Sequence, residues 1–156
     1  MQYKGTLIAV TDIEKSKQFY SELFGLKIIM DAGANVQMSE GIFLQTIDTW
    51  PDFINRKKAD IVLENNAVEL YFETDDIDSF IKKLAEYSDV TYLHPVIEHS
   101  WGQRAVRFYD LDHHIIEVAE NIVMVAKRFI HSGLSVEQTA ERMGVDVEVT
   151  KAALNQ

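Results

Sequence analysis

The sequence predicts an α+β protein in which two βαβββ modules pair into one sheet cleft, followed by a helical extension. Two short apolar, β-branched stretches, Gly5–Val10 and Val68–Glu73, each precede an aspartate turn and an amphipathic helical pattern. Three further strand patterns follow each helix. Each module is expected to cover one face of its sheet with its own helix. The remaining face of each sheet is therefore expected to pack against the other module. After Ile122 apolar residues recur only at helical spacing, so a helical tail is expected there.

The first module is predicted from local signals. Thr11-Asp12 supplies a helix N-cap after the first strand, and Gly25 is the residue type that ends a helix in the left-handed conformation. The remaining strands are expected at Leu26–Met30, Asn35–Met38 and Gly41–Ile47. Residues 1–49 are thus assigned to the first module. Residues 50–66 are assigned to a connector with one helical turn, which is either a solvated linker or a functional lid.

The second module, assigned to residues 67–121, repeats this order of elements. Asp76-Ile77-Asp78 follows its first strand as Asp12-Ile13-Glu14 follows the strand of the first module, at an offset of 64 residues. The apolar face of the following helix is formed by Phe80, Ile81, Leu84 and Tyr87. Three more strands are expected at Val90–Ile97, Arg104–Tyr109 and His114–Ala119. The repeated order predicts two related halves.

The tail, residues 122–156, is predicted to hold three helices. The first is expected to end near Gly133, a capping box at Ser135 opens the second, and Gly144 ends it before Asp146 caps the third. This arrangement is similar to part of a helix-turn-helix. Residues 135–156, however, hold four acidic residues against two basic ones, whereas a recognition helix needs the opposite charge. We therefore expect the tail to pack or to form a dimer rather than to bind DNA.

Composition excludes several classes of function. The chain has 156 residues, a formal net charge of −10 and no cysteine, which excludes disulfides, cysteine–zinc sites and thiol catalysis. The acidic excess argues against nucleic acid and anionic membranes as partners. No apolar stretch is long enough to span a membrane, and Met1-Gln2-Tyr3-Lys4 does not begin a signal peptide, so we expect a cytoplasmic protein.

Alternation along the strands predicts polar groups among apolar ones. In Val68–Glu73 the apolar residues are expected to face the helix. The residues turned to the other side are Glu69, Tyr71 and Glu73. By the same alternation, Glu117 and Gln45 are expected on the sheet faces that the modules share.

Buried carboxylates require compensation, and two sources of it are open. A divalent cation would suit carboxylate and amide oxygens. The alternative is an internal ion pair with Arg104 or Arg107 on the neighbouring strand.

The densest polar and aromatic stretch is His94–Arg107. Trp101 and Arg104 lie around a bend at Gly102, and such residues at the mouth of a sheet suit a small organic or anionic ligand. A surface loop with a packed tryptophan is the alternative. His94 and His99 are five residues apart, so on a regular strand they would point to opposite faces and would not form a ligand pair.

Two parts of the chain are similar to a known family. The first is the strand–helix opening Val10–Leu26. The closer likeness lies in the second module, in E-L-Y-F-E-T-D-D-I-D and H-P-V-I-E-H-S-W-G-Q-R-A-V-R-F-Y-D-L-D-H-H-I-I-E-V-A-E. Both resemble the vicinal oxygen chelate superfamily, which includes glyoxalases, bleomycin-resistance proteins and extradiol dioxygenases. The resemblance covers about residues 3–121. It implies the sheet cleft of that superfamily, with a small-molecule ligand.

The resemblance also implies a ligand set for a metal. In metal-dependent members each module gives one ligand from its first strand and one from its last, and these positions fall on Gly5, Gln45, Glu69 and Glu117. A divalent metal ion would therefore be held by Gln45, Glu69 and Glu117. Gly5 cannot ligate, so water or a neighbouring group fills its place, or no metal binds. The usual Asp-Pro-Asp-Gly turn here ends in His113, which is thus expected at a positive φ.

The activity implied is that of a glyoxalase-like lyase or isomerase. A metal would polarise a small carbonyl or enediolate compound in a lactoylglutathione lyase-type reaction, or support dioxygenase-type chemistry. Glu117 would be the catalytic base. Substrate would contact Trp101, Arg104, Tyr71 and Phe43. The alternative is a metal-free drug- or metabolite-binding protein of the bleomycin-resistance type, and we expect a homodimer for either function.

Overall fold

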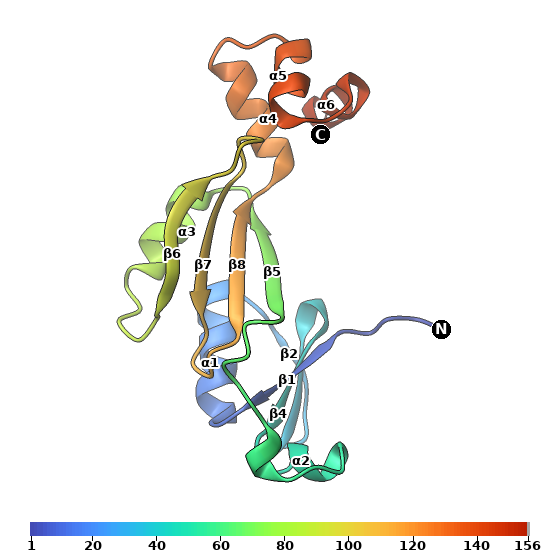
Figure 1. The fold of residues 1–156 in the computed structure, drawn as a ribbon, viewed down its shortest axis with the longest axis vertical. Helices are drawn as coiled ribbons and strands as arrows, with labels where there is room; N and C mark the ends of the chain where they lie inside the picture. The colour runs from blue at the N-terminus through green and yellow to red at the C-terminus, as the bar shows by residue number, and fades with distance from the viewer. Residues whose placement is uncertain (156) are drawn as a thin grey trace. The chain divides into compact units, whose positions relative to one another are not determined.

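The computed structural model describes residues 1–155, which divide into two units (Figure 1). Met1–Val68 and Leu111–His114 form the first unit, and Glu69–Asp110 together with the residues from Ile115 onward form the second. Each unit is built around one four-stranded mixed sheet. The predicted α+β class, with two βαβββ modules and C-terminal helices, is confirmed. None of the helices in residues 1–155 is long and apolar enough to cross a membrane.

The sheet of the first unit has the strand order β1-β4-β3-β2. Its elements are β1 (Thr6–Val10), α1 (Ile13–Phe24), β2 (Ile28–Asp31), β3 (Asn35–Met38) and β4 (Ile42–Thr46). β1 and β4 are parallel, and the other pairs are antiparallel. The connector that follows holds α2 (Trp50–Phe53) and a 3-10 turn at Lys58–Asp60.

Helix α1 begins and ends where the local signals predict. The Asp12 carboxylate accepts a hydrogen bond from the backbone N–H of Lys15 at 3.1 Å. Gly25 adopts φ 71° and its N–H returns to the carbonyl of Ser21, which ends the helix. Phe19 and Tyr20 are buried and meet edge to face, so the apolar side of α1 anchors the core of this unit.

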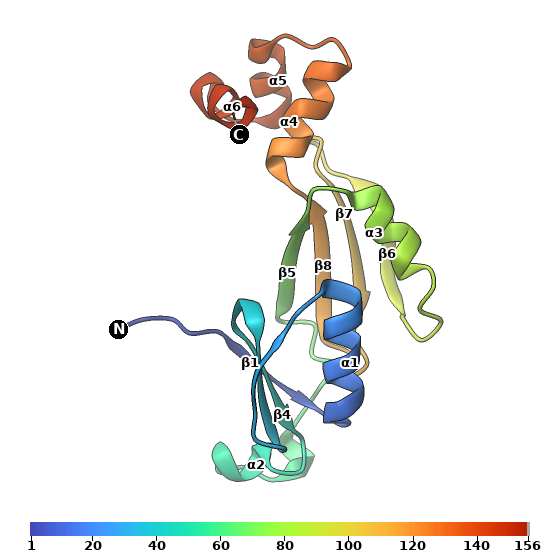
Figure 2. The ribbon, with the colours of Figure 1, turned by 180° about the vertical axis from the view of Figure 1, so that it is seen from behind.

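The sheet of the second unit has the order β5-β8-β7-β6. Its elements are β5 (Glu69–Thr74), α3 (Ile77–Leu84), β6 (Tyr92–Glu98), β7 (Arg104–Tyr109) and β8 (Ile115–Glu120). Helix α3 lies against one face of this sheet, as the front and back views show (Figures 1 and 2). Its N-cap is Asp76, whose carboxylate accepts from the backbone N–H of Ser79 at 2.9 Å. Ile77, Leu84 and Phe108 are fully buried between helix and sheet.

The turn between β7 and β8 belongs to the first unit. Asp112 is buried there and accepts hydrogen bonds from the backbone N–H and the hydroxyl of Thr11, at 3.0 and 2.6 Å. His113 adopts φ 63°, which confirms the expectation for this position.

The tail forms three helices around a small core of its own. They are α4 (Ile122–His131), α5 (Val136–Met143) and α6 (Val147–Leu154). Ser135 and Gln138 form the predicted capping box, and Gly144 ends α5 at φ 69°. The buried residues of this core are Val125, Ala126, Phe129, Met143 and Ala153. The tail therefore folds as a helical cluster at the end of β8.

Candidate functional site on the open face of the second sheet

The register of the second sheet separates two faces. Leu70, Val106 and Ile116 lie on the face covered by α3, and all are buried. On the opposite face Tyr71 and Arg107 stand directly beside Glu117, one on each side, because both are its register partners. We call this side the open face. Alternation along β5 puts Glu69 and Glu73 on it as well.

Arg107 is the centre of the charged groups on the open face. Its Nε donates to Oε2 of Glu69 at 3.0 Å, and its Nη2 forms an ion pair with Glu117. Its Nη1 lies 3.4 Å from Nε2 of His94. Glu117 is only 5 % exposed, so its carboxylate needs a counter-charge, and Arg107 provides it. The ion pair that the sequence left open as one alternative is thus the arrangement observed.

The donor groups do not fit a divalent cation as they stand. The two carboxylates expected as ligands, Glu69 and Glu117, both bind the same guanidinium, so their oxygens are not free to coordinate a metal ion. Over residues 1–155 no three histidine, aspartate or glutamate side chains converge in a way that could hold a metal ion. Binding of a metal ion by Glu69 and Glu117 remains a prediction, and their ion pairs with Arg107 argue against it.

The first module offers no ligand at the matching positions. At the 64-residue offset, the register pair Tyr71–Glu117 corresponds to Leu7–Phe43, so Phe43 is the counterpart of Glu117. Gln45 lies two residues further along β4, and Gly5 is the counterpart of Glu69. Glycine and phenylalanine side chains have no donor atom that can coordinate a metal ion.

The amide of Gln45 is engaged within its own unit. Gln45 is 2 % exposed. Its Oε1 accepts from Nδ2 of Asn35 at 2.7 Å, and its Nε2 donates to the hydroxyl of Thr49 at 2.5 Å. Both ends of this side chain are therefore satisfied locally. Phe43 lies in the same strand and is partly buried.

Tyr71 and Trp101 are joined through Gln103. The amide of Gln103 donates to the Tyr71 hydroxyl at 3.3 Å, while its carbonyl oxygen accepts from the indole N–H of Trp101 at 3.1 Å. The Tyr71 hydroxyl donates to Glu73 at 2.9 Å. Partial burial is the larger cause that raises the pKa of Tyr71, and the hydrogen bond to Glu73 raises it further. The phenol therefore stays protonated. Both aromatic rings stay accessible, with Tyr71 51 % and Trp101 40 % exposed.

The ring of Trp101 also stacks on His99. The two ring centroids are 4.4 Å apart and the planes differ by 6°. The stacked rings and the Tyr71 ring make an accessible aromatic border beside the carboxylates of the open face. This border is the part of the predicted substrate site that the structure brings together.

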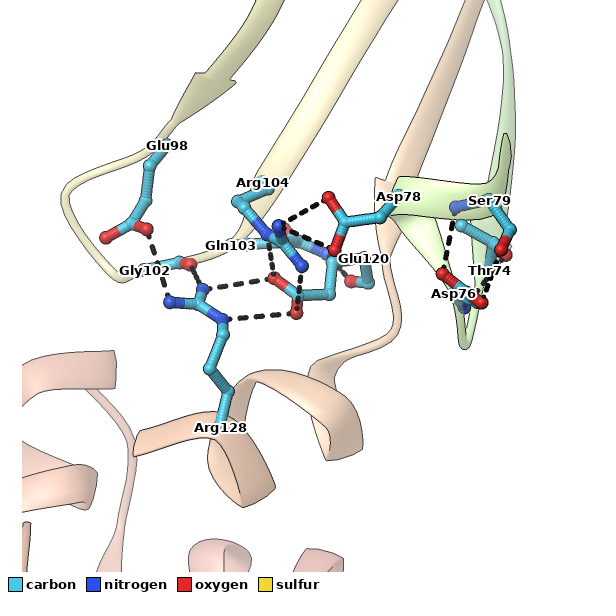
Figure 3. Close-up of polar contacts among 10 residues, drawn as sticks. All are labelled: Thr74, Asp76, Asp78, Ser79, Glu98, Gly102, Gln103, Arg104, Glu120 and Arg128. Atoms are coloured by element: carbon cyan, nitrogen blue, oxygen red, sulfur yellow. Dashed lines mark hydrogen bonds and ion pairs between the residues drawn. The ribbon is translucent and has the colours of Figure 1, made fainter. Parts of the chain in front are cut away.

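Arg104 lies on the other side of the sheet. It projects from β7 toward α3, where Nη1 donates to Asp78 at 3.1 Å and Nε and Nη2 bind Glu120 at 3.2 and 3.1 Å (Figure 3). The hydrogen bonds that Arg104 donates to Glu120 raise the pKa of Arg104. Its charge is therefore committed to an internal network, away from Tyr71 and Trp101.

Two residues of this region gave no functional signal in the sequence. Gln103 lies in the stretch singled out as polar and aromatic, but an isolated glutamine has no spacing that marks a role. Arg128 lies in the tail, and its pairing with Glu120 depends on how α4 packs against β8. Only the fold brings such partners together.

Comparison with known proteins gives the family. A family model, the Glyoxalase-like domain, matches residues 3–123. The chain belongs to this family. The name of a solved structure that is 26 % identical, a member of the glyoxalase/bleomycin resistance protein/dioxygenase superfamily, agrees with this family match and with the resemblance to the vicinal oxygen chelate superfamily. No curated protein matches the chain.

Three solved structures illustrate the likeness. A protein of unknown function from Agrobacterium tumefaciens is 35 % identical, with 78 % of this chain and 94 % of that chain covered and a TM-score of 0.70. A superfamily member from Sphaerobacter thermophilus is 26 % identical, with 78 % and 98 % covered and a TM-score of 0.59. A family enzyme from Burkholderia phytofirmans is 13 % identical, with 77 % and 98 % covered and a TM-score of 0.68, and supports the fold alone. The family match ends at residue 123, so most of the helical tail lies outside it.

Proposed function

We propose that this glyoxalase-like protein binds a small cationic aromatic molecule on the open face of its second sheet, without a metal ion. The observation that carries the proposal is the bridging of Glu69 and Glu117 by Arg107. A guanidinium between two carboxylates supplies the charge that a metal would otherwise supply. This favours the drug- or metabolite-binding branch of the superfamily over the metal-dependent one.

The charge and the aromatic rings of the open face support a cationic ligand. Glu69, Glu73 and Glu117 bring three negative charges to this face, against the one positive charge of Arg107. The accessible rings of Tyr71 and Trp101 border these carboxylates. A flat cation gains both from the carboxylates and from the electron-rich faces of such rings.

A glyoxalase-like lyase or dioxygenase-type reaction is less well supported. In the predicted reaction Glu117 would accept a proton as the catalytic base, but its carboxylate already binds Arg107, which a substrate would have to displace. Metal-assisted chemistry at this face would first require Arg107 to leave both carboxylates.

A homodimer remains part of the proposal. Three apolar residues of the edge strand β2 are exposed, namely Ile28, Ile29 and Met30. An exposed apolar edge strand is suited to contact with another chain. Sedimentation equilibrium would detect the dimer, and a monomer at high concentration would contradict it.

The binding proposal is tested with two probes of the same shape. N-methylquinolinium is a permanent cation, whereas quinoline is neutral at pH 7.5. Titration calorimetry with each, with and without EDTA, is expected to give tighter binding of the cation, insensitive to EDTA and weakened by salt. Glu73→Gln is expected to weaken binding by about fivefold, since it removes one of the facing charges. The exposed Glu86→Gln is the matched control.

Three results would contradict the proposal. Equal affinity for both probes would remove the role of charge. Binding that EDTA abolishes would point to a metal. No binding of either probe, in a protein that is folded by circular dichroism, would remove the binding role itself.

A further inference from the structure

The loop that carries Trp101 is a tight turn between β6 and β7. The backbone N–H of His99 donates to the carbonyl of Gln103 at 2.9 Å, and that of Gly102 donates to the carbonyl of His99 at 2.8 Å. Gly102 adopts φ 89°, a conformation that suits glycine. These bonds close the loop, but they leave the carbonyl groups of Ser100 and Gly102 available to other donors.

The helical tail supplies those donors. Nη1 of Arg142, in α5, donates to the carbonyl of Ser100 at 2.7 Å, and Nη2 of Arg128, in α4, donates to the carbonyl of Gly102. Phe129 packs so closely on Gly102 that a Cβ atom there would lie 2.1 Å from its Cζ. The guanidinium carbons of Arg128 and Arg142 lie over this ring, at 5.0 and 5.8 Å from its centroid. The loop is thus held by two charge-assisted hydrogen bonds and one ring.

The donor in α4 is itself anchored to the sheet. Arg128 binds both carboxylate oxygens of Glu120, with its Nε 3.2 Å from Oε1 and its Nη2 3.0 Å from Oε2 (Figure 3). Glu120 is 3 % exposed and also binds Arg104, which reaches Asp78 in α3. A buried carboxylate shared by two arginines has little freedom to rearrange. The base of the tail is therefore fixed to β8.

Two further ion pairs link the tail to the strand before the loop. Glu98, at the end of β6, lies 3.3 Å from Nη1 of Arg128 and 3.5 Å from Nη2 of Arg142. The two arginines therefore contact the loop in two places. They pair with Glu98, which precedes it, and they donate to the carbonyl groups of Ser100 and Gly102. The tail contacts neither Tyr71 nor the carboxylates of the open face directly in any of these bonds, so its effect on them must pass through the loop.

We propose that the helical tail is a clamp that positions Trp101 at the border of the open face, with Arg142 and Arg128 as positioning residues. The clamp lies almost wholly beyond residue 123, where the family match ends, so it is an addition of this chain to the family fold. Its effect on ligand affinity rests on the proposed function, because Trp101 is a ligand contact only in that proposal. Its effect on the loop does not.

The test uses the fluorescence of Trp101. The chain has two tryptophans, so Trp50→Phe leaves Trp101 as the single tryptophan, whose emission is excited selectively at a wavelength that tyrosine does not absorb. Arg142→Met in this background removes the bond to Ser100 and keeps an unbranched side chain without the guanidinium. We expect the Trp101 emission to shift to the red and its quenching by acrylamide to increase. Arg142→Lys, which can still donate to the carbonyl, is expected to restore much of the wild-type signal.

Two controls separate positioning from simple loss of structure. Lys151→Met changes an exposed cation of α6 that pairs only with Glu148 among the bonds of the described chain, and it should leave Trp101 unchanged. Circular dichroism at 222 nm and the melting temperature report whether the tail of Arg142→Met is still folded. Arg142 is half-exposed, so the variant is expected to fold.

The outcomes distinguish the clamp from the proposed function. Unchanged Trp101 emission and quenching in a folded Arg142→Met variant would overturn the clamp, whatever the ligand does. If the Trp101 signal changes, N-methylquinolinium affinity should also fall, by up to about tenfold for one lost charge-assisted hydrogen bond. A changed signal with no binding in the parent protein would uphold the clamp and overturn only the ligand proposal.

Discussion

Replacing Arg107 by methionine tests the centre of the proposed site. The change leaves Glu117, which is 5 % exposed, without the cation that compensates its charge. Removing one partner of a buried pair costs about 3–5 kcal/mol, and because the Arg107 side chain is 27 % exposed we expect about 3 kcal/mol here. For a chain of this size that corresponds to a fall in melting temperature of about 6–12 °C.

The same variant should acquire a response to divalent cations. With Arg107 gone, the carboxylates of Glu69 and Glu117 are free to bind Mn²⁺ or Ca²⁺. A site with a dissociation constant of about 1 mM would restore about 1.4 kcal/mol at 10 mM metal. Urea denaturation followed by circular dichroism, with and without metal, measures both effects. The wild-type protein is expected to show no such stabilisation.

Two control variants test whether Arg107 compensates the buried carboxylate, and two results would contradict these predictions. The double variant Arg107→Met, Glu117→Gln should recover much of the lost stability and lose the metal response, because the buried charge is gone. Arg56→Met, at an exposed arginine of the connector, should change neither quantity. A loss below about 1 kcal/mol in Arg107→Met would refute the view that Arg107 compensates Glu117. Metal stabilisation of the wild-type protein would refute the metal-free site.

Three further predictions concern the clamp, the buried carboxylate and the turn. Gly102→Ala should cost about 2–4 kcal/mol, since its Cβ would overlap the Phe129 ring at a positive φ, and adding Phe129→Ala should relieve part of this cost in a double-mutant cycle. Although burial raises it, hydrogen bonds from Arg104 and Arg128 hold the pKa of Glu120 below its ordinary value of 4.5. The stability that Glu120 contributes is therefore fully present above about pH 4.5 and is lost as the pH falls through the lower folded-state pKa. Glu120→Gln should be less stable than wild type at pH 7 and show a shallower loss of stability below pH 4.5. Asp112→Ala should cost about 2 kcal/mol, since the backbone N–H and hydroxyl of Thr11 lose their acceptor.

Each of these predictions has an outcome that contradicts it. Additive losses in the Gly102 and Phe129 cycle would mean that the two side chains do not clash. Parallel acid-unfolding curves for wild type and Glu120→Gln would mean that Glu120 is not the titrating group. If Asp112→Ala and Thr11→Val each left the urea midpoint unchanged, the turn would not be held by this pair.

Local signals allowed most element boundaries to be predicted. Asp12, Gly25, Ser135 and Gly144 act through hydrogen bonds or backbone conformations that involve residues no more than about five positions away. Strand alternation is equally local, so the side of β5 on which Glu69 lies follows from the sequence of that strand. Such features need no knowledge of distant neighbours.

Local signals could not predict which side chains pair with one another across the sheet. Arg104 and Arg107 lie three residues apart on one strand, and the sequence offered either as the counter-ion of the carboxylates. The register of β7 against β8 sends Arg107 to Glu117 and Arg104 to Glu120, on opposite faces. Likewise, the register of β1 and β4 makes Phe43 rather than Gln45 the counterpart of Glu117. A shift of one residue would exchange these faces, and only packing sets the register.

The sequence by itself determined the modular α+β plan, the helix caps, the tail and the membership in a superfamily, because these depend on short-range patterns that repeat along the chain. The tertiary structure alone decided that a guanidinium compensates the two carboxylates, that Gln103 links Tyr71 to Trp101, and that the tail grips the Trp101 loop. Each of these contacts joins residues that are distant in sequence or brought together by the fold of a loop. Their geometry follows from strand register and helix packing, which arise only when the whole unit folds.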